Sequence, residues 1–305
     1  MSEPVAPTGP ARKRARMQTW GLIAIALALY GMLRFVLGPL PQDPSYHILA
    51  DTRRCGPIPR AGDVLTNLSI LAAGVAGLFL RRRVHVEREE RAAYALLVAG
   101  MLLTALGSAY YHWVPGDARL VWDRLPMTLV LAAPLTFLLA DRIHPVFATV
   151  ALWPIAALGA ASVLWWAWTR WQGADDLRLY LIVRIGTGVA IACLLLLRRG
   201  QYSGAPWLWA VLALDVTMTV AERLDNEIYS AIGMFVSGHN VKHLHCRSVA
   251  GMHARLAGAA RAVRAFRRPG STVLAHEAIP GSAASRLLQR HGHRLLSLPE
   301  TSLQI

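Results

Sequence analysis

Residues 92–112 read AAYALLVAGMLLTALGSAYYH and decide the fold, because they contain no Asp, Glu, Lys or Arg. A helix of this length crosses about 30 Å of hydrocarbon. Other predicted spans cover 20–37, 64–80, 124–140, 146–168, 179–197 and 206–221, and a last helix is predicted to begin near Ser237. The sequence therefore predicts an all-α, polytopic transmembrane helix bundle.

The composition supports this class of protein. Of the 305 residues, 54% are hydrophobic and only 16% are charged, whereas soluble domains are about one quarter charged. The net charge is +14, but the arginines gather at the ends of apolar runs and in the C-terminal tail. This distribution is typical of membrane topology rather than of phosphate binding. We expect membrane lipid as a partner and no nucleic acid.

Charge also divides the chain and orients it. We expect a basic cytoplasmic tail over 1–18, a transmembrane domain over 19–244 and a basic C-terminal tail over 245–305. The loop 81–91 contains five arginines, and it lies on the same predicted side as the basic N-terminus. Loops on the other side are poorer in basic residues or balanced by acids. The positive-inside rule then places the N-terminus in the cytoplasm.

Five polar residues fall at one level of this predicted topology. Ser108 and His112 are four residues apart, as are His239 and His243, so each pair shares one helix face. Asp123 lies at the start of the next predicted span. All five are predicted at the outer membrane surface, where polar groups close to hydrocarbon are costly unless they have a function.

Three imidazoles and an open position are the usual ligand set of a catalytic zinc ion. His112, His239 and His243 are therefore predicted to bind Zn²⁺. Asp123 is placed to act as a general base toward zinc-bound water, and Ser108 to donate a hydrogen bond to the oxyanion.

Each residue also has a simpler interpretation. For His239 and His243, the alternative is an interfacial pair that faces lipid headgroups. Asp123 is suited to capping a helix that begins at Arg124. Ser108 lies in the small-residue patch 107–109, which favours close helix packing.

Other polar residues carry less specific patterns. His47 is predicted to be a solvated interfacial histidine. Asp63 and Asn67 lie four apart at the start of a helix and are expected to cap it. Asp215 lies inside an apolar run, so we expect it to face the bundle interior, with Arg184 as a partner.

The segments GSAYYH (107–112), WDRLPM (122–127) and SGHNVKH (237–243) together resemble the alkaline ceramidases. That family has S-x-x-x-H, an Asp eleven residues after the His, and a late H-x-x-x-H. It belongs to a superfamily of seven-helix membrane hydrolases that includes adiponectin-receptor-like proteins. The resemblance covers about residues 40–244 and is to the bacterial branch, which implies a bacterial inner membrane and makes 20–37 an extra helix.

The resemblance implies that His112, His239 and His243 bind zinc, that Asp123 activates water and that Ser108 assists. The implied reaction is hydrolysis of a lipid amide, such as a ceramide, to a free amine and a fatty acid. Eukaryotic members carry a calcium site around a Trp-Cys-Glu segment, which this sequence lacks, so we expect no calcium. The alternatives are a non-catalytic receptor-like or lipid-binding bundle, or an inactivated relative.

The C-terminal tail departs from the family pattern. The family continues with an apolar helix after the second histidine, whereas this chain continues with His245, Cys246, Arg247 and Ser248 and has no later apolar run. One hypothesis is a shift of reading frame close to His245. The alternative is a basic amphipathic segment over 247–268 that lies on anionic lipid.

Overall fold

The structure is a computed structural model that describes residues 9–80, 88–198 and 205–244. Within these ranges the chain is helical, without a named strand, and the only extended pairing is one β-bridge between Cys55 and Ile58. The predicted all-α bundle is therefore confirmed. The predicted tail 245–305 and most of the loop 81–91 lie outside the described residues.

Seven long helices of the described ranges form the bundle. They are α1 (Gly9–Val36), α2 (Ala61–Leu80), α3 (Arg91–Trp113), α4 (Asp117–Arg142), α6 (Leu152–Trp171), α7 (Arg178–Leu197) and α8 (Ala205–Arg223). The short helices are α5 (Phe147–Val150) and α9 (Asp225–Ala231), with 3₁₀ turns η1 (Pro44–His47) and η2 (Arg88–Glu90). Residues 238–244 are also helical, which confirms a helix start near Ser237.

Three predicted boundaries are wrong, each for a local reason. The span predicted over 146–168 divides into α5 and α6, because Pro154 has no N–H for the carbonyl of Val150. The first helix begins at Gly9 and continues through basic residues that hydropathy excludes. The fourth begins at Asp117, so Asp123 lies inside α4 and does not cap it.

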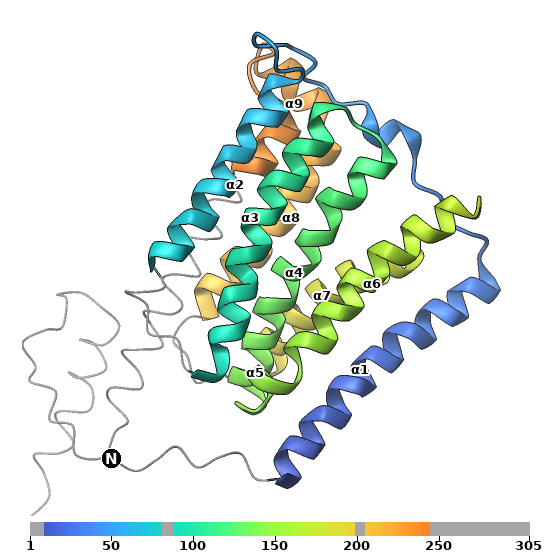
Figure 1. Ribbon diagram of the computed structural model, residues 1–305, viewed down its shortest axis with the longest axis vertical. Helices are drawn as coiled ribbons and strands as arrows, with labels where there is room; N and C mark the ends of the chain where they lie inside the picture. The colour runs from blue at the N-terminus through green and yellow to red at the C-terminus, as the bar shows by residue number, and fades with distance from the viewer. Residues whose placement is uncertain (1–8, 81–87, 199–204, 245–305) are drawn as a thin grey trace, which may run out of the picture.

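The helix α4 is central to the bundle. It packs against α3, α5, α6 and α7, while α2 packs on the far side of α3. Figure 1 shows α1 leaning on one side of the bundle, near α5 and α6. It also shows that the end of α3 and the helix α9 lie at the same end of the molecule. This end contains the polar residues predicted above.

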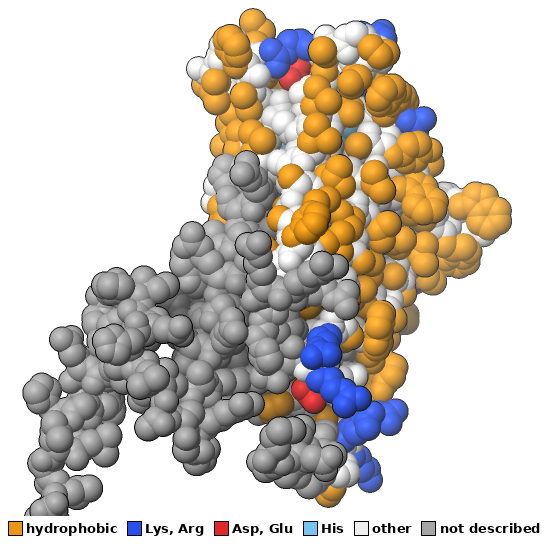
Figure 2. Space-filling model, turned by 60° about the vertical axis from the view of Figure 1, so that its left-hand side comes forward, with side chains coloured by type: hydrophobic (Ala, Val, Ile, Leu, Met, Phe, Trp, Pro, Cys, Tyr) orange, Lys and Arg blue, Asp and Glu red, His pale blue; other side chains and the backbone are white. Residues whose placement is uncertain are grey.

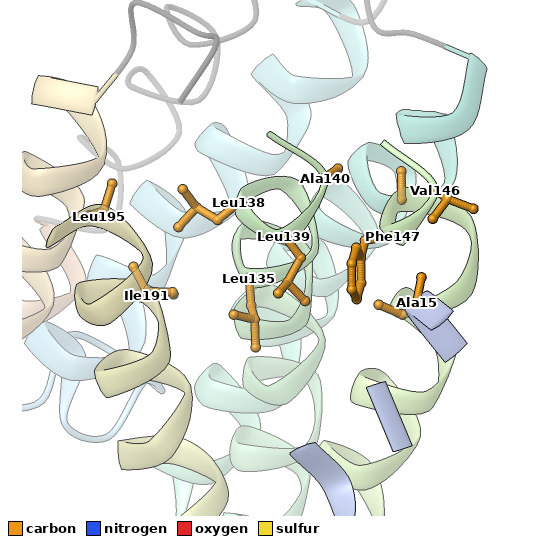
Figure 3. Packing of buried hydrophobic residues seen from close by; sticks show 11 residues of the cluster. Ala15, Leu135, Leu138, Leu139, Ala140, Val146, Phe147, Ile191 and Leu195 are labelled. Carbon is orange, nitrogen blue, oxygen red and sulfur yellow. The ribbon is translucent and has the colours of Figure 1, made fainter. Parts of the chain in front are cut away.

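A buried apolar cluster holds the opposite end together. Leu138 and Leu139 of α4 belong to this cluster together with Phe147 of α5 and Ile191 of α7, and Ala15 brings α1 into it (Figure 3). Burying side chains of this size contributes about 1.5–3 kcal/mol each when the reference is water. The cluster fixes α1, α5 and α7 around α4.

The outer surface of the bundle is apolar. Large side chains such as Phe35 and Phe79 are mainly exposed, and hydrophobic side chains cover the middle of the face drawn in Figure 2. In the described part of the chain, six helices are long and apolar enough to cross a membrane: α1, α2, α3, α4, α6 and α7. The chain therefore fits an integral membrane protein. The crossing predicted for α8 stays a prediction.

Candidate metal centre

Three buried histidines meet where the end of α3 contacts the 238–244 helix. His112 lies on the last turn of α3, and His239 and His243 are successive positions on one face of the second helix. Their ring centroids are 4.5–5.1 Å apart, and each residue is at most 3% exposed. Residues separated by more than 120 positions in the chain are thus brought into one cluster.

The ring nitrogens of this cluster suit a metal ion. One potential ligand atom from each histidine lies within 4.8 Å of those of the other two, and the Nε2 atoms of His112 and His239 are 3.0 Å apart. Two nitrogens bound to one tetrahedral Zn²⁺ at about 2.0–2.1 Å would be about 3.3 Å apart. The donor set can therefore hold a metal ion, and the separation of the His112 and His239 nitrogens is close to this value.

Thr66 of α2 orients His243. Its hydroxyl donates a hydrogen bond to the carbonyl of Gly62 (2.8 Å) and lies 2.9 Å from Nδ1 of His243. Because the single hydroxyl proton is used on Gly62, the oxygen accepts from an Nδ1–H group of the ring. The Nε2 atom of His243 then carries the lone pair that a metal requires.

Glu222, at the end of α8, supports His239 from the other side. Its Oε1 lies 3.8 Å from Nδ1 of His239. The same oxygen accepts hydrogen bonds from the hydroxyl of Tyr46 (3.0 Å) and the ammonium of Lys242 (2.6 Å). At 3.8 Å this is a charge contact and not a hydrogen bond, and the negative charge favours an Nδ1–H group on His239, as carboxylates behind metal-binding imidazoles commonly do.

The start of the 238–244 helix is firmly anchored. Ser237 caps it by accepting a hydrogen bond from the N–H of Asn240 (3.1 Å). Asp225 accepts from the N–H of His239 (2.7 Å), and the hydroxyl of Ser69 donates to the carbonyl of His243 (2.6 Å). The described residues therefore anchor both ends of this short helix, and with it both histidines.

Ser108 and Asp123 form a second buried pair beside the histidines. They are 2% and 5% exposed, and the Ser108 hydroxyl lies close enough to the Asp123 carboxylate to interact with it. Gly107 permits this approach, because a Cβ atom there would overlap the backbone carbonyl of Trp122. The close packing predicted for the patch 107–109 thus depends on Gly107, and it brings Ser108 to Asp123.

A polar loop closes this end of the bundle. Asp51 is fully buried and accepts two hydrogen bonds from the guanidinium of Arg53 (2.8 and 2.7 Å). It also accepts from the side chain of Asn240 (3.3 Å). Burial raises the pKa of Asp51, but the hydrogen bonds from Arg53 lower it more, so the pKa lies below its usual value. The loop is thereby tied to the histidine helix.

The remaining polar residues have mixed outcomes. His47 is not merely solvated, because its ring contacts the hydroxyl of Tyr111 (3.0 Å) and Asp117 (3.0 Å). Asp215 and Arg184 form the expected pair at 3.5 Å. Asp63 does lie in the first turn of α2, but it is fully buried, and its carboxylate oxygens have no hydrogen-bond partner among the described residues.

Sequence patterns missed the supporting residues. Thr66 lies beside Asn67, and Lys242 lies within SGHNVKH, but neither stands out by type or spacing. Glu222 resembles an ordinary loop acid at the end of an apolar run. The one sequence indication of a supporting role is the position of Lys242 inside the H-x-x-x-H motif. The roles of Thr66 and Glu222 depend on contacts between helices, which the sequence does not give.

The chain matches no protein-family model, no curated protein and no solved structure. The fold and the site alone define the class of this chain: an all-α membrane bundle with a three-histidine cluster that can hold a metal ion. Membership of the alkaline ceramidases remains a prediction from the motifs.

Proposed function

We propose that the protein is a zinc-dependent intramembrane hydrolase that cleaves the amide bond of a ceramide-like lipid. The observation that carries this proposal is the buried cluster of His112, His239 and His243, with a buried carboxylate and hydroxyl beside it. A set of three neutral imidazoles suits Zn²⁺ and leaves an open coordination position. That open position is characteristic of catalytic rather than structural zinc.

Zinc, when bound, lowers the pKa of a water ligand toward neutrality and polarises a carbonyl group. Asp123 then takes a proton from the attacking water and returns it to the leaving amine nitrogen. Ser108 lies beside the Asp123 carboxylate, and once Asp123 has taken the proton of the water, the single hydroxyl proton of Ser108 is free to turn toward the negative charge on the carbonyl oxygen. Thr66 and Glu222 keep the imidazoles of His243 and His239 aimed at the metal.

The surroundings favour a lipid substrate. The candidate site lies at one end of an apolar bundle (Figure 1), so a substrate can keep its acyl chains in the hydrocarbon while its amide reaches the site. We place the N-terminus in the cytoplasm and the site near the outer face of a bacterial inner membrane. The gathering of Lys and Arg toward the opposite end in Figure 2 supports this orientation.

The test is hydrolysis of defined lipid amides by purified protein. Ceramides, N-acyl amino acids and simple fatty amides are incubated in mixed micelles, and released fatty acid is measured by mass spectrometry. The wild type is expected to hydrolyse at least one class. Asp123→Asn should keep its fold and zinc but lose about 10²–10⁴-fold in rate, the usual contribution of a general base.

Two results would contradict the proposal. One is a zinc-loaded, folded wild type that hydrolyses none of these amides. The other is an Asp123→Asn variant that is as active as wild type. Either result would favour the non-catalytic lipid-binding alternative.

A further inference from the structure

The first turns of α1 carry a basic groove on the surface of the bundle. It is shallow and open, has a volume of about 630 Å³, and is lined by Gly9, Arg12, Lys13, Arg16, Met17 and Trp20. These positions follow one side of the helix, because an α-helix has 3.6 residues per turn. All three cations are exposed, and the first turn of α1 contains no acidic residue.

The cations of the basic groove have no counter-ion within the described part of the chain. None of these three side chains has an ion-pair or hydrogen-bond partner there. Other arginines of the bundle differ: Arg34, at the far end of α1, lies 3.8 Å from Asp176. Arg142, at the end of α4, pairs with Asp141 at 2.9 Å. An anion that binds in the groove therefore comes from outside the described chain.

The same side of α1 changes from basic to apolar toward the middle of the helix. Met17 and Trp20 are exposed beyond the cations, and Leu27 continues this side as a further exposed apolar residue. With a rise of 1.5 Å per residue, Trp20 lies about 6 Å beyond Arg16 along the axis. Tryptophan is enriched at the boundary between lipid headgroups and hydrocarbon. The groove thus presents positive charge at the depth of phosphates and apolar surface at the depth where acyl chains begin.

The basic groove lies at the end of the bundle opposite the histidines. Figure 1 shows the start of α1 at the other end of the molecule from α9. The neighbouring side of the helix, with Ala15 and Thr19, is buried, so α1 is held in place while the groove stays open. In the orientation proposed above, this end meets the cytoplasmic leaflet, where anionic lipids attract basic segments.

We propose that the basic groove binds the headgroup of an anionic phospholipid, with the start of one acyl chain along Met17 and Trp20. Arginine and lysine both bind phosphate oxygens through charge-assisted hydrogen bonds. Phosphatidylcholine has the same phosphate, but its choline cation opposes binding next to three positive charges. The inference does not depend on the proposed hydrolysis, because it concerns the other end of the bundle.

Lipid binding to the full-length protein in a non-ionic detergent tests this proposal. Palmitoyl-oleoyl phosphatidylglycerol and phosphatidylcholine with the same chains are titrated, and bound lipid is measured by native mass spectrometry. We expect phosphatidylglycerol to bind at least about tenfold more tightly. Raising the salt concentration from about 0.1 M to 1 M shortens the Debye length from about 10 Å to 3 Å. It should therefore weaken the binding of phosphatidylglycerol more than that of phosphatidylcholine.

Substitutions locate the binding site. Arg16→Gln should weaken phosphatidylglycerol binding by about fivefold, and replacing all three cations by Gln should weaken it by about 10²-fold. The matched control is Arg14→Gln: Arg14 is exposed at the same depth, but it lies about 160° around the helix from Arg16 and does not line the groove. This control should stay within about twofold of wild type. The Tm of each variant without lipid confirms that its fold is intact.

Arg16→Lys keeps the positive charge and should retain most of the affinity. If the triple variant is not recovered as folded protein, the comparison of Arg16→Gln with Arg14→Gln decides. Three results would overturn the proposal: equal affinities for the two lipids, unchanged phosphatidylglycerol binding after loss of the groove cations, or equal losses in Arg14→Gln and Arg16→Gln. The last result would indicate a diffuse attraction of this end of the protein to anionic lipid instead of a site.

Discussion

Replacing Thr66 by Val tests whether the contact to His243 tunes a metal site. The Thr66 hydroxyl lies 2.9 Å from Nδ1 of His243 and donates to the carbonyl of Gly62. Val has nearly the same shape but no hydroxyl. The variant therefore removes the group that fixes the His243 tautomer, with little change in packing.

The expected loss of zinc affinity is about tenfold. Outer-shell partners of metal-binding histidines contribute about 10–100-fold in affinity, or ~1.4–2.7 kcal/mol. A single neutral hydrogen bond contributes about 0.5–1.5 kcal/mol. Because Thr66 makes one such contact with the ring, the effect should lie at the lower end of the range.

The assay is the zinc dissociation constant, measured by competition with a chromophoric chelator in detergent. The matched control is Thr217→Val. Thr217 is exposed on α8, and its hydroxyl also donates to a carbonyl one turn earlier (2.8 Å). Equal dissociation constants for the two variants would refute the assigned role of Thr66.

Three further predictions concern the surroundings of the site. Gly107→Ala should lower the free energy of unfolding by about 1–3 kcal/mol, because the new Cβ would overlap the backbone of α4. Gly186→Ala, where the new Cβ meets open space, should leave it unchanged. Equal Tm values for the two variants would contradict this prediction. Glu222→Gln should weaken zinc binding. Glu227 is an exposed acid in α9, so Glu227→Gln should not. Equal zinc affinities of the two variants would show that the Glu222 carboxylate does not support the site. Because the pKa of Asp51 is lowered by folding, its stabilisation is present above the unfolded pKa and is lost as the pH falls further. The Tm difference between wild type and Asp51→Asn should therefore shrink below about pH 4, and a constant difference would contradict the ion pair.

Hydropathy located the helices but not their ends. Charged residues at 117–124 interrupt the apolar run, so the sequence placed the start of the fourth span at 124, whereas α4 begins at Asp117. The interpretation of Asp123 as a helix cap failed for that reason. Polar residues in the first turns of a helix lower its hydropathy, so a helix start estimated from hydropathy falls too late.

The spacing of residues in the sequence predicted which histidines cluster, but not which residues hold them in place. The four-residue spacing of His239 and His243 and the membrane level of His112 predicted one cluster, and the three side chains do meet. The contact of Thr66 with His243 could not be assigned from the sequence, because it depends on how α2 packs against the 238–244 helix. Nor could the burial of Arg124 among aromatic rings, which three separate segments contribute.

Zinc content is the most direct test of the central claim. Protein purified in detergent without added metal is analysed by mass spectrometry, beside a His239→Ala variant whose fold is checked by circular dichroism. The three-histidine centre predicts about one zinc per wild-type chain and a large loss in the variant. Folded wild type without zinc, or a variant that retains the full complement, would contradict it.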